Sequence, residues 1–95
     1  MAVKIIIKRQ VPKDKEADVL PLLIELRAKA TTQPGYISGE TLRNVDRPEE
    51  YVVISTWQSA EVWKAWQASG ERDAIHNRLK SLLEEETEYG AYFYG

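Results

Sequence analysis

The sequence predicts an α+β domain with the element order β-α-β-β-α-β, the ferredoxin-like order, with helices on one face of an antiparallel sheet. Two observations predict this class: segments rich in β-branched or aromatic residues alternate with segments of helical periodicity, and turn residues separate them. A third is the length of 95 residues, which suits one domain and is too short for two independent cores. We therefore expect a single domain over residues 1–95.

The first predicted strand covers residues 3–9 and is clearly apolar on one face. Val3, Ile5 and Ile7 alternate along that face, whereas the opposite face is mixed and carries Lys8. A period of two residues places alternate side chains on opposite sides of a sheet. The first face is therefore expected to point into the core.

A helix is predicted next, over residues 15–31, from apolar residues at helical spacing. The stripe consists of Val19, Leu20, Leu23, Ile24, Leu26 and Ala30. Pro21 lies near its beginning, where the first N–H groups have no partner within the helix. We expect either a regular start near residues 17–18 or an irregular first turn.

The middle of the chain is predicted to form a hairpin. Pro34 and Gly35 break the helix, and two strand-like segments follow over residues 36–43 and 51–57. The connection between them is short and polar, which favours antiparallel pairing.

The C-terminal part is predicted as a broken helix and a last strand. Ser59 is a good N-cap for a helix over residues 60–68, and Gly70 separates this helix from a second one over residues 71–83. Residues 86–94 then form a strand that is aromatic on both faces. Tyr92 and Tyr94 share one face, and Tyr89 and Phe93 share the other.

The aromatic residues on both faces of the last strand indicate that the protein associates with another chain. Helices of this arrangement cover only one face of the sheet, so a bulky opposite face needs another cover. A second copy of the same sheet in a two-fold homodimer is the simplest one.

Composition excludes several function classes. The formal net charge of -2 gives no electrostatic reason to expect nucleic acid or an anionic membrane as partner. The absence of cysteine excludes disulfides and thiolate metal sites, and no other metal-binding spacing is present. Without a signal peptide or an apolar span in this sequence, a cytoplasmic location is expected.

Three stretches resemble the antibiotic biosynthesis monooxygenase family. They are residues 33–36 (Gln-Pro-Gly-Tyr) before a strand, residues 53–59 with Trp-x-Ser at a strand end, and Trp66 followed ten residues later by His76. The element order also matches that of the family, so the resemblance covers nearly the whole chain. It implies a dimeric α/β barrel in which the sheets of two subunits pack together.

The family includes enzymes that oxidise polyketide phenols to quinones without metal or flavin, haem-degrading monooxygenases, and members of unknown activity. The resemblance implies Trp66 and His76 as catalytic residues, with His76 ligating iron only where haem is bound. Lys8 and Val62 stand where the haem-degrading and quinone-forming branches, respectively, carry an asparagine.

Each candidate site residue has a functional and a packing interpretation. Trp66 is predicted to wall a pocket for a flat aromatic ligand, although aromatics at helical spacing are more often core. His76 titrates near neutral pH and suits a base, or it is a partly buried histidine bonded to backbone.

Four further residues are predicted to bind substrate: Trp57, Tyr36, Tyr51 and Lys8. The tyrosine hydroxyls suit a phenolic or quinone ligand, and interface packing is the alternative. Lys8 suits a carboxylate or an oxyanion, and a solvated edge residue is the alternative.

The function that the sequence favours is a cofactor-independent monooxygenase acting on a small phenol- or quinol-like aromatic. Two alternatives stay open. One is a haem-binding and haem-degrading monooxygenase with His76 as axial ligand. The other is a non-catalytic dimeric module that binds a small ligand or serves in a stress response.

Overall fold

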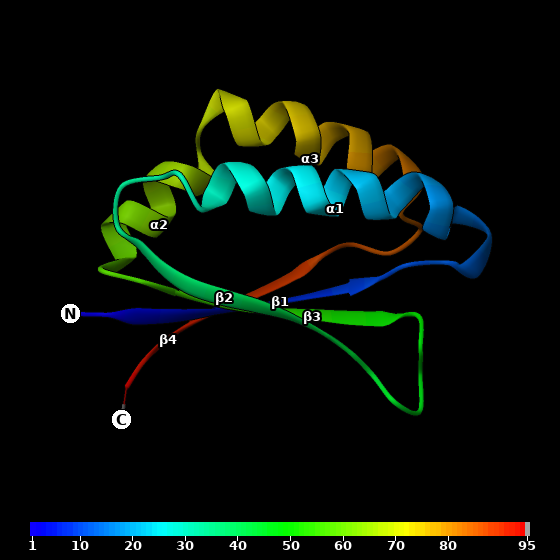
Figure 1. The fold of residues 1–95 in the computed structure, drawn as a ribbon, viewed down its shortest axis with the longest axis horizontal. Helices are drawn as coiled ribbons and strands as arrows, with labels where there is room; N and C mark the ends of the chain where they lie inside the picture. Colours follow the sequence, from blue (N-terminus) through cyan, green and yellow to red (C-terminus); the bar gives the residue numbers. More distant parts are fainter. Residues whose placement is uncertain (95) are drawn as a thin grey trace.

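The computed structural model describes residues 1–94 and confirms the predicted element order. Strand β1 (Val3–Gln10) leads through a 3-10 turn, η1 (Lys13–Lys15), into helix α1 (Glu16–Ala30). The hairpin consists of β2 (Tyr36–Arg43) and β3 (Glu50–Trp57). The broken helix consists of α2 (Ala60–Gln67) and α3 (Gly70–Leu82), and β4 (Glu88–Phe93) ends the fold (Figure 1).

The four strands form one sheet in the order β2-β3-β1-β4, with every neighbouring pair antiparallel. The three α-helices lie on one side of this sheet (Figure 1). The α+β, ferredoxin-like class predicted from the sequence is therefore confirmed.

Helix α1 begins at Glu16, slightly before the regular start that Pro21 led us to expect near residues 17–18, and Pro21 lies inside the helix. The η1 turn precedes it, and no side chain caps its first N–H groups. The predicted apolar stripe is partly wrong, because Ile24 is 70% exposed and Leu22 is buried instead. The stripe that faces the sheet runs at i, i+3 and i+7 through Val19, Leu22 and Leu26.

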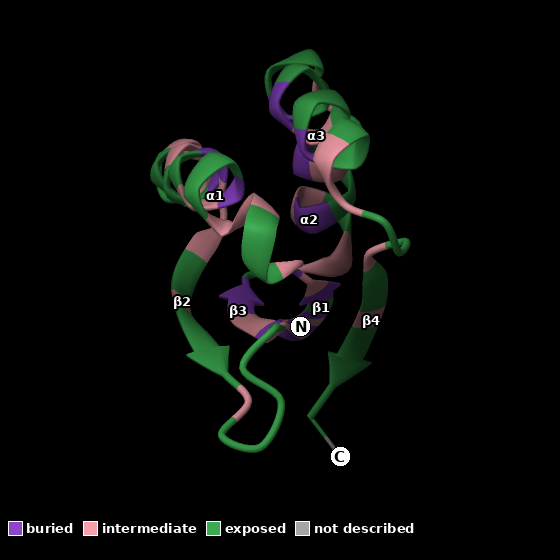
Figure 2. Cartoon of the chain, turned by 90° about the vertical axis from the view of Figure 1, so that its right-hand side faces the viewer, coloured by how far each residue is buried: buried purple, intermediate pink, exposed green. Residues whose placement is uncertain are grey.

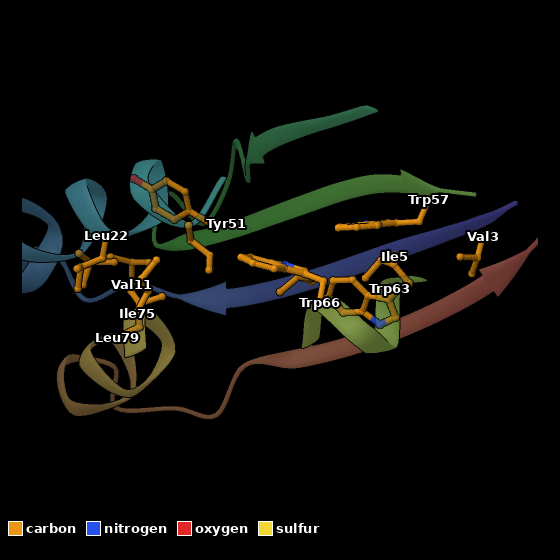
Figure 3. Packing of buried hydrophobic residues seen from close by; sticks show 13 residues of the cluster. Val3, Ile5, Val11, Leu22, Tyr51, Trp57, Trp63, Trp66, Ile75 and Leu79 are labelled. Carbon is orange, nitrogen blue, oxygen red and sulfur yellow. The ribbon is translucent and has the colours of Figure 1, made fainter. Parts of the chain in front are cut away.

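The core lies between the helices and the sheet, where buried residues gather on both layers (Figure 2). The predicted face of β1 points into it, with Val3, Ile5 and Ile7 all buried. Trp63 and Trp66 project from α2 toward the sheet (Figure 3). This places the tryptophans of the broken helix directly above the central strands.

Two serine caps set the direction of the broken helix. The Ser59 Oγ accepts a hydrogen bond from the Val62 N–H at 3.3 Å, which confirms the predicted cap of α2. The Ser69 Oγ accepts from the Arg72 N–H at 3.2 Å and begins α3. The second cap fixes Arg72 in the first turn of α3, close to the end of α2.

The opposite face of the sheet carries no helix within residues 1–94 (Figure 2). Strand register places Lys4, Ile6 and Lys8 of β1 on this open face, together with Ile54 of β3 and Tyr92 of β4. Among residues 1–94 there is also no helix with the length and apolar character needed to cross a membrane.

Candidate functional site

A cavity of about 70 Å³ lies between the sheet and the helices α1 and α2. Five aromatic side chains form much of its wall: Tyr36, Tyr51, Trp57, Trp63 and Trp66. In the view of Figure 3, Trp66 lies between Tyr51 and Trp57 along the direction of the strands. The aromatic wall therefore extends over the length of the cavity.

One end of the cavity is built around Trp57. Its ring packs edge-on against Tyr36, with 5.3 Å between ring centroids, and against Trp63 at 5.6 Å. The Trp57 Nε1–H donates a hydrogen bond to the Ser55 Oγ at 3.1 Å, so its polar group is satisfied. Packing and this hydrogen bond therefore hold Trp57 in one position at this end of the cavity.

The cavity wall also holds two buried arginines, Arg9 from β1 and Arg72 from α3. They are 3% and 5% exposed. Arg72 donates hydrogen bonds to the Gln67 backbone carbonyl at 3.2 Å and to the Tyr89 Oη at 2.5 Å. The Arg9 Nε is buried and has no hydrogen-bond partner within residues 1–94.

The electrostatic environment of Arg9 is unfavourable to its charge. Burial lowers the pKa of Arg9, and the nearby positive charge of Arg72 lowers it further, whereas Tyr89 acts in the opposite direction. At the same end of the sheet, burial raises the pKa of Tyr51, whose hydroxyl donates to the Glu16 carboxylate at 3.3 Å. Tyr51 therefore stays a neutral hydroxyl at physiological pH.

The cavity meets solvent between α1 and β2, where its lining residues Arg27 and Thr41 are exposed. Arg27 bridges the two elements there. Its Nη2 donates to the Gly39 carbonyl at 2.6 Å, and its Nη1 lies 3.4 Å from the Thr41 Oγ1. A third positive charge thus stands at the mouth of the cavity.

The structure brings four of the predicted site residues together: Trp66, Trp57, Tyr36 and Tyr51 all line the cavity. Their roles in binding or catalysis stay predictions. Lys8 is exposed on the open face of the sheet, on the side away from the cavity. The β1 residues that line the cavity are Ile7 and Arg9.

His76 also lies outside the cavity that Trp66 lines. It borders a separate surface depression beside Lys80, Glu84 and Tyr89. Burial lowers the pKa of His76, the charges of Arg72, Arg9 and Lys80 lower it further, and Asp73 opposes them. Its Nδ1 is buried without a hydrogen-bond partner within residues 1–94.

This arrangement does not fit a haem held between Trp66 and His76. Trp66 lines the cavity, whereas His76 borders a separate surface depression, so the two residues do not face one shared space. Within residues 1–94, histidine and carboxylate side chains form no group that would hold a metal ion.

Arg9 and Arg72 were missed as candidate site residues. The signal for Arg9 was available, because it continues the alternation of Val3, Ile5 and Ile7 and so points to the core side. Arg72 gave a weaker signal, since an arginine near the beginning of an exposed helix is ordinary. The structure shows that Arg72 is buried and that its guanidinium donates to the Tyr89 Oη of β4.

Comparisons with known proteins agree with this fold. The model of the family described as antibiotic biosynthesis monooxygenase matches residues 2–78. Protein SchA of Streptomyces halstedii is 25% identical over 69 residues, which is 73% of this chain and 18% of that protein. The chain therefore matches less than a fifth of the length of this relative.

Two solved structures show the same fold over nearly the whole chain. A conserved protein from Methanosarcina mazei Go1 superposes with a TM-score of 0.89 at 22% identity, covering 97% of this chain and 91% of that one. SnoaB from Streptomyces nogalater, a cofactor-independent oxygenase, gives a TM-score of 0.87 at 20% identity, covering 99% and 93%.

Proposed function

The chain belongs to the antibiotic biosynthesis monooxygenase family, and from this premise we propose that it is a cofactor-independent monooxygenase acting on a small phenol- or quinol-like aromatic. The observation that carries the proposal is the cavity walled by Tyr36, Trp57, Trp63 and Trp66. Similarity in fold to SnoaB, a cofactor-independent oxygenase, supports it.

The proposed reaction uses the substrate as its own reductant. The phenol loses its proton, and the phenolate transfers one electron to O₂. The resulting radical pair combines to form a carbon–oxygen bond, and the peroxide anion takes up a proton from solvent. The hydroperoxide then loses water, because the C–H proton leaves, the O–O bond breaks and a carbonyl forms. Overall, the phenol and O₂ give a quinone and one water, so atoms and electrons balance without another reductant.

The protein contributes to this reaction by binding and exclusion of water. Trp66 and Trp57 hold the ring in one orientation, and the aromatic wall limits the access of water to the peroxide. His76 was predicted as the base, and its ring lies outside the cavity. The proposal therefore depends on Trp66 and on the stability of the phenolate, with the proton passing to solvent.

Oxygen consumption tests the proposal. We expect O₂ uptake with dihydroxynaphthalene or anthrone substrates, and we expect Trp66→Phe to lower kcat/KM by about tenfold or more, because a displaced ring loses its orientation. Ile24→Ala, on the exposed face of α1, is the control and should change kcat/KM by less than about twofold. No uptake above background with either substrate class would overturn the proposal.

A non-catalytic binding module is the second candidate. The absence of His76 from the cavity wall favours it, because no imidazole then faces the ligand. Such a module binds the same aromatic compounds without consuming O₂. The oxygen measurement separates the two functions.

We also propose that the protein works as a homodimer joined through the open faces of two sheets. The open face exposes Tyr92 and Leu42, and apolar patches of this kind mark interaction sites. It also carries both Lys8 and Glu40, so a second copy offers complementary charges.

A further inference from the structure

Arg9 and Arg72 form a buried positive centre that the proposed reaction has not yet used. Both line the cavity, and neither makes an ion pair with a carboxylate within residues 1–94. The carboxylate of Glu16, near Tyr51 at this end of the sheet, is engaged by Arg43 at 3.3 Å and by the Tyr51 hydroxyl. The described part of the chain therefore supplies no carboxylate as counter-ion for either arginine.

Such an arrangement is costly unless an anion completes it. A buried charge without a partner is strongly destabilising, and two like charges that interact increase the penalty. The hydrogen bonds of Arg72 offset part of its cost, but the Arg9 Nε has no acceptor within residues 1–94. A donor that is buried, charged and without an acceptor on a cavity wall indicates a negatively charged ligand.

The register of the sheet shows how a ligand would lie. Val3 pairs with Trp57 at one end, and Arg9 pairs with Tyr51 toward the other, with Ile7 and Val53 between them. The aromatic pocket and the arginine pair are therefore separated along the strands. Trp66 lies between the two ends (Figure 3), so a flat ring against Trp66 can point its polar substituent toward the end of the cavity where Arg9 lies.

We propose that this cavity binds its aromatic ligand as an oxyanion, with the negative oxygen held by Arg9 and Arg72 and the ring held by the tryptophans. The inference rests on the proposed function and gives its substrate class: an aromatic compound that is ionised when bound. Arg27 at the mouth adds positive charge along the entry path.

This assignment gives the arginines a part in the chemistry. An opposite charge at close range favours the ionised form of a group, so the arginine pair lowers the pKa of a bound phenol. The phenolate is the form that gives an electron to O₂. Arg9 and Arg72 therefore act by holding the substrate in its reactive ionisation state.

The first test uses matched ligands and the wild-type protein. Benzoate and benzamide have nearly the same shape, but only benzoate is charged. We expect millimolar benzoate to raise Tm in a concentration-dependent way, and benzamide to give a much smaller rise. Equal effects of the two compounds, or no effect of benzoate, would overturn the inference.

The second test reads the ionisation of a bound phenol directly. The phenol and phenolate of 4-nitrophenol have different absorption spectra, so its titration midpoint can be followed with protein in excess. We expect the wild-type protein to lower this midpoint by about one pH unit or more. A lowered midpoint shows that the site binds a phenolate. Stabilisation by benzoate without a lowered midpoint would show that the site takes carboxylates only.

Two variants assign the effect to the arginine pair. Arg9→Met and Arg72→Met should each remove most of the midpoint shift and weaken nitrophenolate binding by about tenfold or more. Arg78→Met is the matched control, because Arg78 is an exposed arginine of α3 outside the cavity. A shift that persists in both cavity variants, or that Arg78→Met also removes, would contradict the assignment.

These outcomes are distinct from those of the proposed function. Anion binding without O₂ uptake would leave this inference standing and overturn the oxygenase. O₂ uptake with no midpoint shift and no preference for benzoate over benzamide would support the oxygenase and overturn this inference. Should Arg9→Met fail to fold, the benzoate and benzamide comparison still decides, because it needs no variant.

Discussion

At the scale of single residues, the two buried arginines differ in how well the chain satisfies them. Arg72 has acceptors on α2 and β4 that hold its guanidinium in place. Arg9 has a fixed position on the central strand β1 and a donor without an acceptor within residues 1–94. Arg72 is therefore a preorganised group, and Arg9 is the one whose hydrogen bonding an anion completes.

His76 gives a prediction about pH dependence. Burial and the positive charges of Arg72, Arg9 and Lys80 hold its pKa below the unfolded-state value, against the opposing Asp73. Tyr89 of β4 and Glu84 border the same depression. The unfolded chain then binds more protons than the native state as pH falls through about 6.5, so native stability decreases with acidification.

We therefore expect His76→Gln to remove this part of the acid sensitivity. Its Tm should fall less than the wild-type Tm between about pH 7 and about pH 5, because glutamine does not titrate. The sequence has one histidine, so the difference between the two curves over this range reports on His76. Parallel curves for wild type and variant would show that the residue does not lose stability on protonation.

The sequence predicted the aromatic residues of the cavity but not its arginines. Four aromatic residues were predicted because large aromatics on a buried face line any cavity in the core. They are Trp66, Trp57, Tyr36 and Tyr51. Arg9 was passed over because a charged residue at a strand end is normally solvated. Its burial depends on residues that are distant in sequence, such as Arg72 of α3, which lines the same cavity.

At the scale of elements, Gly35 couples the beginning of β2 to helix α2. Gly35 has a positive φ of 86°, a conformation that side chains rarely adopt. A Cβ there would lie 2.5 Å from the Val62 Cγ2. The Gly35 carbonyl also accepts a hydrogen bond from the Gln58 N–H at 2.8 Å, next to the cap of α2.

We expect Gly35→Ala to lower the free energy of unfolding by about 2–4 kcal/mol, because it adds left-handed backbone strain and overlap with Val62. Gly70→Ala is the matched control, since no heavy atom lies within 4 Å of its added Cβ. It should be neutral or stabilise by up to about 1 kcal/mol. Urea denaturation of both variants checks this, and equal stabilities would contradict it.

The elements themselves were largely predictable from local signals. The hairpin and the two serine-capped helices follow from turn residues and caps within a few positions of each boundary. The error at Ile24 and Leu22 has a different origin. Helix α1 has apolar residues on a wide arc, so only its packing against the sheet decides which edge of the arc is buried.

At the scale of the whole molecule, the two faces of the sheet are unequal. The helix-covered face buries Val3, Ile5 and Trp57, whereas the open face leaves Leu42 and Tyr92 exposed. Lys4 lies across the open face, with its Nζ 3.3 Å from the Thr56 Oγ1 and 5.8 Å from the centre of the Tyr94 ring. Exposed apolar residues gathered on one face mark an interaction site, and a second copy of this chain is the partner that we propose.

We expect sedimentation at micromolar concentration to give the mass of two chains. Ile54→Glu, at the centre of the open face, should reduce this to the mass of one chain, because each subunit would bury an unpaired charge at the interface. Leu42→Glu, on β2 at the same face, is a second variant that leaves the central strands intact. Ile24→Glu makes the same kind of change on the exposed side of α1 and should leave the mass unchanged. A wild-type mass of one chain would contradict the dimer, and the anion site of Arg9 and Arg72 would still stand, because a single chain supplies both arginines.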